Sequence, residues 1–241
     1  MSEIVFLAGA TGAIGSALLP LLVEAGYTVY GSSRKPCRVA AIAATGATPV
    51  LVDVFEAEAL ARTLAAIRPG VVVHQLTDLP AGLDPALMAE GRARNARLRE
   101  QGTTHLVAAT VAAGCRRMVA QSIAWAYAPG PLPHAEADSL DLATPGVPAL
   151  ERLVLHTPGL QGAVLRYGML YGPGTGMAGP TGAMPVHVEA AARAALLAVQ
   201  RRANGAFNVA EDNPQVSSER AQRELGWHAG MRVGTSPAPV R

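Results

Sequence analysis

A glycine-rich turn near the N-terminus constrains the fold more than any other feature of this sequence. Gly9, Gly12 and Gly15 follow the apolar run Ile4–Ala8 and open the alanine- and leucine-rich stretch Ala13–Ala25. In such a pattern the first glycine permits a tight turn, the second lets the backbone approach a ligand, and the third lets a helix pack against a strand. The turn therefore predicts a strand–turn–helix unit whose free N–H groups and helix dipole hold a pyrophosphate.

The chain then repeats this alternation of short apolar runs and helical stretches. We expect five further strands, at Thr28–Gly31, Thr48–Val52, Val71–Leu76, Arg117–Ser122 and Gln161–Arg166. Helices are expected at Pro36–Thr45, Glu56–Arg68 and Leu150–His156, with a long helical region, broken near Gly91 or Gly102, that ends at Gly114. Near-continuously apolar strands separated by helices indicate a parallel sheet covered on both faces. The expected fold class is α/β, a Rossmann-like doubly wound sheet.

The C-terminal part is less regular. Ala128–Pro148 and Gly172–Pro185 are rich in proline and glycine, and we expect both to be long loops. A helix at Val188–Gln200, a short strand near Phe207–Ala210 and a helix near Ser217–Leu225 follow. We assign residues 1–170 to a dinucleotide-binding domain and 171–241 to a small substrate-side cap that packs on it within one compact unit.

Composition excludes several classes of partner. A chain of 241 residues, half of them hydrophobic, suffices for one α/β domain. A net charge of +2 and few aromatic residues argue against a nucleic-acid partner. The two cysteines lack metal-ligand spacing, so no metal site is expected. Neither a signal peptide nor a membrane-spanning run is recognisable, and we expect a cytoplasmic protein without a membrane partner.

The second expected strand bears on the cofactor. Dinucleotide-binding chains that prefer NAD place an acid near its end, whereas this sequence has Ser32, Arg34 and Lys35 there. These residues favour a 2′-phosphate, and hence NADP over NAD, although NAD stays possible; the alternative is a solvated basic turn. Asp53 and Val54, after the third strand, are placed near the adenine, unless Asp53 caps the next helix.

Several further segments accompany the glycine loop in the order typical of one family. They are Asp53–Val54, Val73–Thr77, Gly102–Val107, Gln121–Ser122, Leu165–Gly168, Tyr171–Gly174, Pro185–Val188 and Phe207–Ala210. With these segments the chain resembles the extended short-chain dehydrogenase/reductase superfamily, specifically the NAD-dependent epimerase/dehydratase family. The likeness covers most of the chain, and it is specific for the superfamily but not for a substrate.

The resemblance implies roles for individual residues. In the glycine loop, Thr11, Ala13 and Ile14 would join the glycines in binding the cofactor, and the remaining cofactor residues would be Leu76, Thr77 and Tyr167 on the nicotinamide side. Ser122 matches the family's catalytic Ser/Thr, whose hydroxyl bonds a substrate oxygen. A simpler interpretation is that Ser122 only ends a strand.

The sequence departs from the family at the catalytic base. The family uses the Tyr of a Tyr-x-x-x-Lys pair, in which Lys lowers the pKa of the phenol. If Glu151 matches the usual glutamate beyond that lysine, Ala143 and Val147 occupy the Tyr and Lys positions. Tyr127, five residues after Ser122, is the candidate to replace the base, although a structural aromatic is an equal interpretation.

These residues predict an NADP-dependent oxidoreductase that acts on a small carbonyl or alcohol. The segment between Tyr171 and His187 is short, which favours a substrate smaller than a nucleotide sugar. Two alternatives stay open because fold does not determine function: a non-catalytic NADP-binding sensor or scaffold, and a non-redox isomerase or dehydratase. A monomer or a homodimer is expected.

Overall fold

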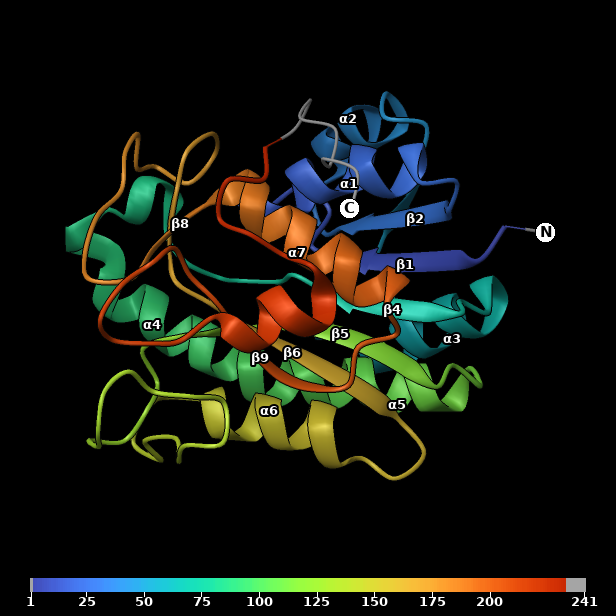
Figure 1. The fold of residues 1–241 in the computed structure, drawn as a ribbon. Helices are drawn as coiled ribbons and strands as arrows, with labels where there is room; N and C mark the ends of the chain where they lie inside the picture. Colours follow the sequence, from blue (N-terminus) through green and yellow to red (C-terminus); the bar gives the residue numbers. More distant parts are fainter. Residues whose placement is uncertain (1, 233–241) are drawn as a thin grey trace, which may run out of the picture.

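A seven-stranded parallel sheet forms the centre of the protein. The computed structural model describes residues 2–232, and Figure 1 shows their arrangement. The strands are β1 (Ile4–Ala8), β2 (Thr28–Ser33), β3 (Thr48–Leu51), β4 (Val71–His74), β5 (Arg117–Ile123), β6 (Gln161–Tyr167) and β9 (Gly205–Val209). Their order is β3-β2-β1-β4-β5-β6-β9, with every pairing parallel. The strand order therefore reverses between β1 and β4, and a sheet of this kind binds ligands at the carboxyl ends of the strands at such a switch point.

Helices cover both faces of the sheet (Figure 1). One face carries α1 (Ala13–Glu24), the short α2 (Val39–Ala43) after η1 (Pro36–Arg38), and α7 (Val188–Gln200). The other carries α3 (Ala57–Ile67), α4 (Met88–Arg97), α5 (Thr103–Ala112) and α6 (Val147–His156). Smaller elements lie at the edges, namely η2 (Ala81–Leu83), η3 (Pro85–Leu87), the π-helical stretches η4 (Leu98–Gly102) and η5 (Ala221–Leu225), and the strand pair β7 (Met169–Tyr171) and β8 (Pro185–His187).

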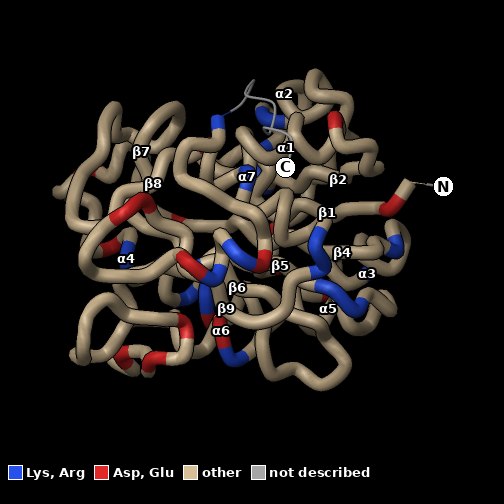
Figure 2. The backbone as a smooth tube through the Cα atoms, viewed as in Figure 1, with Lys and Arg blue, Asp and Glu red and all other residues tan. Residues whose placement is uncertain are grey.

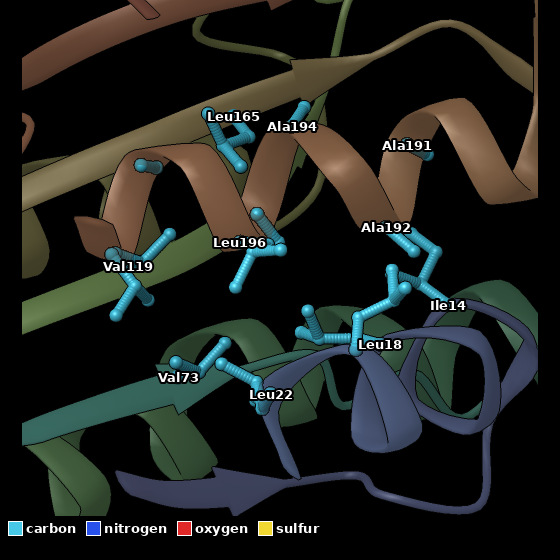
Figure 3. Packing of buried hydrophobic residues seen from close by; sticks show 14 of the residues in the cluster. Ile14, Leu18, Leu22, Val73, Val119, Leu165, Ala191, Ala192, Ala194 and Leu196 are labelled. Carbon is cyan, nitrogen blue, oxygen red and sulfur yellow. The ribbon is translucent and has the colours of Figure 1, made fainter. Parts of the chain in front are cut away.

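Small residues allow α7 to lie close to α1. Figure 3 shows Ala192 and Leu196 of α7 on the side that faces Ile14 and Leu18 of α1, whereas Ala191 and Ala194 lie on the other side of α7. The alanines are fully buried, and their short side chains leave room for the larger leucines and isoleucine of α1. Interdigitation of small and large side chains gives the close packing of protein interiors. The alanine-rich composition thus places two helices on one sheet face.

Most expected elements are confirmed. The first strand and the helix Val188–Gln200 have the bounds predicted from the sequence, and β2 runs two residues further than expected, to Ser33. The helical region runs through both Gly91 and Gly102 without a break, and it changes to a π-helical stretch over Leu98–Gly102. Gly91 packs against Pro80, because an added Cβ would lie 2.5 Å from the proline Cδ.

Helix α6 begins earlier than expected. It starts at Val147 and not at Leu150, so the preceding loop is shorter than Ala128–Pro148. Gly146 adopts the left-handed conformation, with φ of 72°, immediately before the helix. Pro148 lies in the first helical turn, where its missing N–H costs no intrahelical hydrogen bond. Pro148 therefore belongs to the start of α6 and not, as the sequence suggests, to the preceding loop.

The C-terminal segment is joined to the main sheet. Its strand β9 pairs with β6, and α7 packs against α1, so elements beyond residue 170 complete the sheet and one of its helical layers. A domain boundary at residue 170 stays a prediction. Within residues 2–232, no helix combines the length and apolar character needed to cross a membrane.

Candidate cofactor and active site

The three glycines of the N-terminal turn serve different structural purposes. Gly9 has φ of +87°, and a Cβ there would lie 2.8 Å from the backbone of Gln75. A Cβ at Gly15 would lie 2.0 Å from the carbonyl oxygen of Gly9. At Gly12 the backbone is extended, and the nearest atom to an added Cβ is 3.5 Å away. The fold thus requires glycine at two positions, whereas Gly12 leaves space that suits the approach of a ligand.

The N-terminus of α1 faces this space without a cap. Gly12 is the N-cap residue, and within the described residues no side chain caps the helix and no acidic residue lies in its first turn. Uncapped N–H groups at the positive end of a helix dipole suit an anion. The glycine turn therefore has the chemistry of a pyrophosphate site.

A cavity runs along the carboxyl ends of β1, β2, β3 and β4. Nine of the predicted cofactor residues line it: Gly9, Thr11, Gly12, Ser32, Arg34, Asp53, Val54, Leu76 and Thr77. Ala13, Ile14 and Gly15 form the first turn of α1 behind it, and Tyr167 is buried at the end of β6. The lining also includes residues that we did not predict, among them Arg38, Gln75 and Asp78.

The β2 end of the cavity is positively charged. Arg34, Lys35 and Arg38 line it, and Lys35 is the sole lysine of the sequence. The Ser33 hydroxyl accepts a hydrogen bond of 3.2 Å from the Lys35 N–H, which holds the turn after β2. Within residues 2–232, Lys35 and Arg38 form no ion pair, so their charges are available to an anionic ligand. Phosphate is the anion that such clusters bind.

Asp53 organises the turn before α3. Its carboxylate accepts from the N–H of Phe55 at 3.0 Å, and its carbonyl accepts from the N–H of Glu56. The N-cap position of α3 is Glu56, so Asp53 holds the preceding turn and does not cap the helix itself. One carboxylate oxygen has no turn contact in the described residues, and the side chain also lines the cavity.

A buried histidine fixes the backbone at the end of β4. Burial lowers the pKa of His74 to about 4, with Arg99 contributing, so the ring is neutral at neutral pH. Its Nδ1 accepts from the Leu76 N–H at 3.2 Å, which leaves Nε2 to donate to Thr103 at 3.1 Å. The Gln121 amide donates to the Leu76 carbonyl at 2.6 Å. The N–H and the carbonyl of Leu76 are therefore both fixed by hydrogen bonds. Such a fixed backbone suits the predicted place of Leu76 beside the cofactor.

Gln75 and Tyr167 are buried side chains whose polar atoms are not accounted for by the hydrogen bonds of the fold. The amide oxygen and nitrogen of Gln75 and the hydroxyl of Tyr167 are buried and, among the residues that the structure describes, form no hydrogen bond of good geometry, although the two side chains lie near enough for Gln75 to lower the pKa of Tyr167. Burial raises the pKa of the Tyr167 phenol, which is neutral. Unpartnered buried polar groups are rare in folded proteins and are concentrated at functional sites. Together with the open Gly12 and the cationic β2 turn, Gln75 makes the cavity fit a dinucleotide.

The predicted catalytic residues lie in a separate, buried network beyond β4. Ser122 ends β5, and its hydroxyl donates to Glu151 of α6 at 2.7 Å. Glu151 forms an ion pair with Arg166 of β6 at 2.7 Å, with both side chains about 95% buried. Arg166 donates to the Tyr127 hydroxyl at 2.8 Å, and that hydroxyl donates to Asn208 of β9 at 2.6 Å. The structure thus brings Ser122 and Tyr127 together through charged residues.

Tyr127 is held on both its ring and its hydroxyl. Burial raises the pKa of its phenol, although Arg166 acts to lower it. The ring stacks on His134, with centroids 4.7 Å apart, in the loop between β5 and α6 where acidic side chains gather (Figure 2). Neither Ser122 nor Tyr127 lines the cofactor cavity, and their catalytic roles stay predictions. Glu151, Arg166 and Asn208 were not predicted to join them.

The comparisons with known proteins agree with this geometry. Residues 9–195 match the protein family described as NAD(P)H-binding. A "3-diazoavenalumate denitrifying reductase" from a Streptomyces species is 41% identical over 244 aligned positions, covering 89% of this chain and 78% of that protein.

Solved structures share the fold. The UDP-glucose 4-epimerase of Thermotoga maritima matches with a TM-score of 0.78 at 19% identity, covering 96% of this chain and 95% of its own. That of Brucella ovis, in complex with NAD, has a TM-score of 0.76 at 19% identity, covering 95% and 94%. These likenesses confirm the Rossmann-like fold shared with NAD-dependent epimerases. The chain belongs to the NAD(P)H-binding family and is an NAD(P)-dependent, oxidoreductase- or epimerase-like enzyme.

Proposed function

We propose that this protein is an NADP-dependent reductase whose substrate is a small aromatic diazonium compound. The observation that carries the proposal is the absence of the usual proton donor. The sequence has one lysine, Lys35, so no Tyr–Lys pair exists, and the hydroxyls of Ser122 and Tyr127 are committed to a buried network. A reaction that needs no proton from the protein fits such a site.

Replacement of a diazonium group by hydrogen meets this requirement. Bound NADPH supplies a hydride: a C–H bond forms at the ring carbon, the C–N bond breaks with its electron pair leaving on N₂, and NADPH becomes NADP⁺. No proton is consumed, whereas reduction of a carbonyl requires one at the oxygen. The name of the 41%-identical relative, a denitrifying reductase of a diazo compound, supports this class of substrate.

The residues of the cavity have defined roles in this proposal. Gly12 and the first turn of α1 bind the pyrophosphate, and Ser32 and Arg34 bind the 2′-phosphate. Leu76, whose backbone is held by His74 and Gln121, and the adjacent Thr77 contact the nicotinamide side. The preference for NADP over NAD rests on the three cations at the β2 end and on the absence of an acid from the residues that end β2, Ser32 and Ser33.

Exposed apolar side chains lie on the loops that follow the central strands. Leu79, Leu83 and Leu87 follow β4, Trp125 follows β5, and Met169 begins β7 after β6. All are at least 36% exposed. The loop after β7 lies against the loop after β4, because a Cβ at Gly176 would lie 2.7 Å from the Gly82 Cα. Apolar groups gathered at a ligand-binding edge support a flat, aromatic substrate.

Stereospecific deuterium transfer tests the proposal. The purified protein is mixed with a benzenediazonium salt and NADPH that carries deuterium in either the pro-R or the pro-S position at C4. We expect N₂ release and deuterium in the arene from one of the two cofactors only. A reaction without protein measures the background, which labels the arene from both. Equal labelling from both cofactors, or no acceleration over the background, would refute the proposal.

Carbonyl reduction is the second candidate. The position of Ser122 at the carboxyl end of β5, where the related family places a catalytic hydroxyl, favours it. In that case a panel of small carbonyl compounds is turned over, and Ser122→Ala abolishes the turnover. Tight NADPH binding without turnover of either class would instead indicate a sensor. A cytoplasmic location, and a monomer or homodimer, stay predictions; sedimentation in solution tests the oligomeric state.

A further inference from the structure

An ion pair crosses the cofactor cavity at its β2 end. Arg34 Nη2 lies 3.1 Å from Asp78 Oδ1, and both residues line the cavity. Arg34 directly follows β2, and Asp78 lies four residues beyond the end of β4. Because β2 and β4 flank β1 in the sheet, the pair joins the two loops on either side of the glycine turn. A ligand that binds both terminal nitrogens of Arg34 therefore competes with Asp78 for Nη2.

Asp78 is the fixed member of this pair. Its N–H donates to Oδ1 of Asn95, a side chain of α4 that is 4% exposed, at 3.0 Å. Arg94 Nε lies 3.8 Å from the Asp78 carboxylate, which gives it a second cation. Arg34, in contrast, keeps 48% of its side chain exposed. The guanidinium is the group that is free to move between partners.

We propose that Asp78 competes with the 2′-phosphate of the cofactor for Arg34 and so limits the preference for NADPH over NADH. The inference rests on the proposed use of NADP. A guanidinium offers one planar fork for two-point binding of an anion, so a carboxylate and a phosphate cannot both use it fully. NADH has no 2′-phosphate and gains nothing when Asp78 is removed.

The expected effect is moderate because the pair is partly exposed. Exposed ion pairs contribute up to about 1 kcal/mol, which corresponds to an affinity change of up to roughly fivefold. Asp78→Asn keeps the shape and the backbone hydrogen bond to Asn95 while removing the competing charge. We therefore expect NADPH to bind two- to fivefold more tightly to Asp78→Asn than to the unchanged protein, and NADH to bind equally to both.

Isothermal titration of the full-length protein with each cofactor tests this. Asp84→Asn is the matched control, because Asp84 lies on the same loop and its side chain accepts from the Ala86 N–H, as asparagine also does. We expect this control to change neither affinity. In an Arg34→Ala background, Asp78→Asn should not change the affinity for NADPH, because the side chain for which Asp78 and the phosphate compete is absent. Asp78→Ser serves in the same cycle if the asparagine variant does not fold.

The failures of the two proposals are distinguishable. If Arg34→Ala weakens NADPH and NADH equally, the proposed NADP preference fails. If Arg34→Ala weakens NADPH selectively but Asp78→Asn changes nothing, only the role of Asp78 fails. Weaker binding of both cofactors to Asp78→Asn would make Asp78 a direct cofactor contact. Tighter NADPH binding of Asp78→Asn that persists in the Arg34→Ala background would show a general effect of charge. Either of these last two results would overturn the proposal that Asp78 competes for Arg34.

Discussion

The two ends of the strand edge use their polar residues in opposite ways. At β1, β2 and β4, polar groups are open to a ligand: Gly12 leaves space, Arg34 is half-exposed, and Gln75 has an amide without a partner in the described chain. At β5 and β6, the polar groups bond to one another. Ser122 donates to Glu151, which pairs with Arg166, and all three are at least 94% buried. The polar groups at the first end are open to a ligand, whereas those at the second end join β5, β6 and α6 to one another.

This difference bears on which of the two ends could perform acid–base catalysis. A group that delivers a proton must have access to the substrate and a pKa near the working pH. The Ser122 hydroxyl lacks this access because it is buried and donates to Glu151, and the half-buried Tyr127 hydroxyl is engaged by Arg166 and Asn208 while its phenol has a raised pKa. One strand edge can therefore present open polar groups at one end and polar groups bonded to one another at the other.

The largest effect is expected at the buried ion pair. Arg166→Leu leaves the Glu151 carboxylate buried without its cation, and removing one partner of such a pair costs about 3–5 kcal/mol. Urea denaturation should show this loss in the free energy of unfolding. The double variant Glu151→Leu, Arg166→Leu is the control and should recover much of it. A loss below about 1 kcal/mol in the single variant would contradict a structural role for the network.

A pH effect of similar size is expected at the cofactor end. The pKa of His74 is about 4 in the folded protein and about 6.5 when unfolded, so the unfolded chain binds the proton more tightly. The contribution of this group is fully present above about pH 6.5 and is lost as pH falls towards 4, by about 3 kcal/mol. His74→Asn retains a hydrogen-bond acceptor and should flatten that part of the stability profile. An unchanged profile in the variant would exclude His74 as its source.

Two glycine variants sharpen the contrast between folding and binding. Gly15→Ala places a Cβ against the Gly9 carbonyl and should destabilise the fold by about 1–3 kcal/mol. Gly12→Ala meets no atom closer than 3.5 Å, so its melting temperature should be nearly unchanged. Its affinity for NADPH should fall by about tenfold because the methyl group occupies the ligand's approach, a cost of about 1.4 kcal/mol. Equal NADPH affinity in Gly12→Ala would show that the cofactor does not approach this glycine.

A small effect on stability, opposite in sign to that of Gly15→Ala, is expected at Gln75. Gln75→Leu removes two buried polar atoms without partners and should stabilise the cofactor-free protein by about 1 kcal/mol. The same change should weaken NADPH binding. Thermal melting and titration measure the two quantities, with the exposed Gln222→Leu as a control that changes neither. A destabilised Gln75→Leu protein would show that the amide serves the fold.

The sequence alone predicted the regions where local rules decide the structure. The glycine spacing predicted the turn and the first strand and helix, because the positive φ of Gly9 and the contact of Gly15 with the Gly9 carbonyl are set within a few residues of chain. The basic turn after β2 was likewise readable, since Arg34 and Lys35 are adjacent to the end of a strand. The nine predicted residues that line the cavity come from such strand ends.

The missed features depend on contacts between distant segments. Asp78 meets Arg34 across 44 residues of chain, and Ser122 meets Glu151 across 29. No local pattern encodes such pairs, although Arg166 within an apolar strand signals that a buried partner must exist. Strand order has the same limit: the sequence indicated a short strand near Phe207, but its place beside β6 depends on the whole sheet.

The central claim is that hydride transfer here needs no proton donor from the protein. Turnover of a benzenediazonium salt by the double variant Ser122→Ala, Tyr127→Phe, measured as NADPH-dependent N₂ release per folded molecule, tests it most directly. The account predicts a kcat within about threefold of the unchanged protein, since the chemical step loses less than about 1 kcal/mol. A fall of about a hundredfold or more, the size typical of a lost general acid, would contradict it.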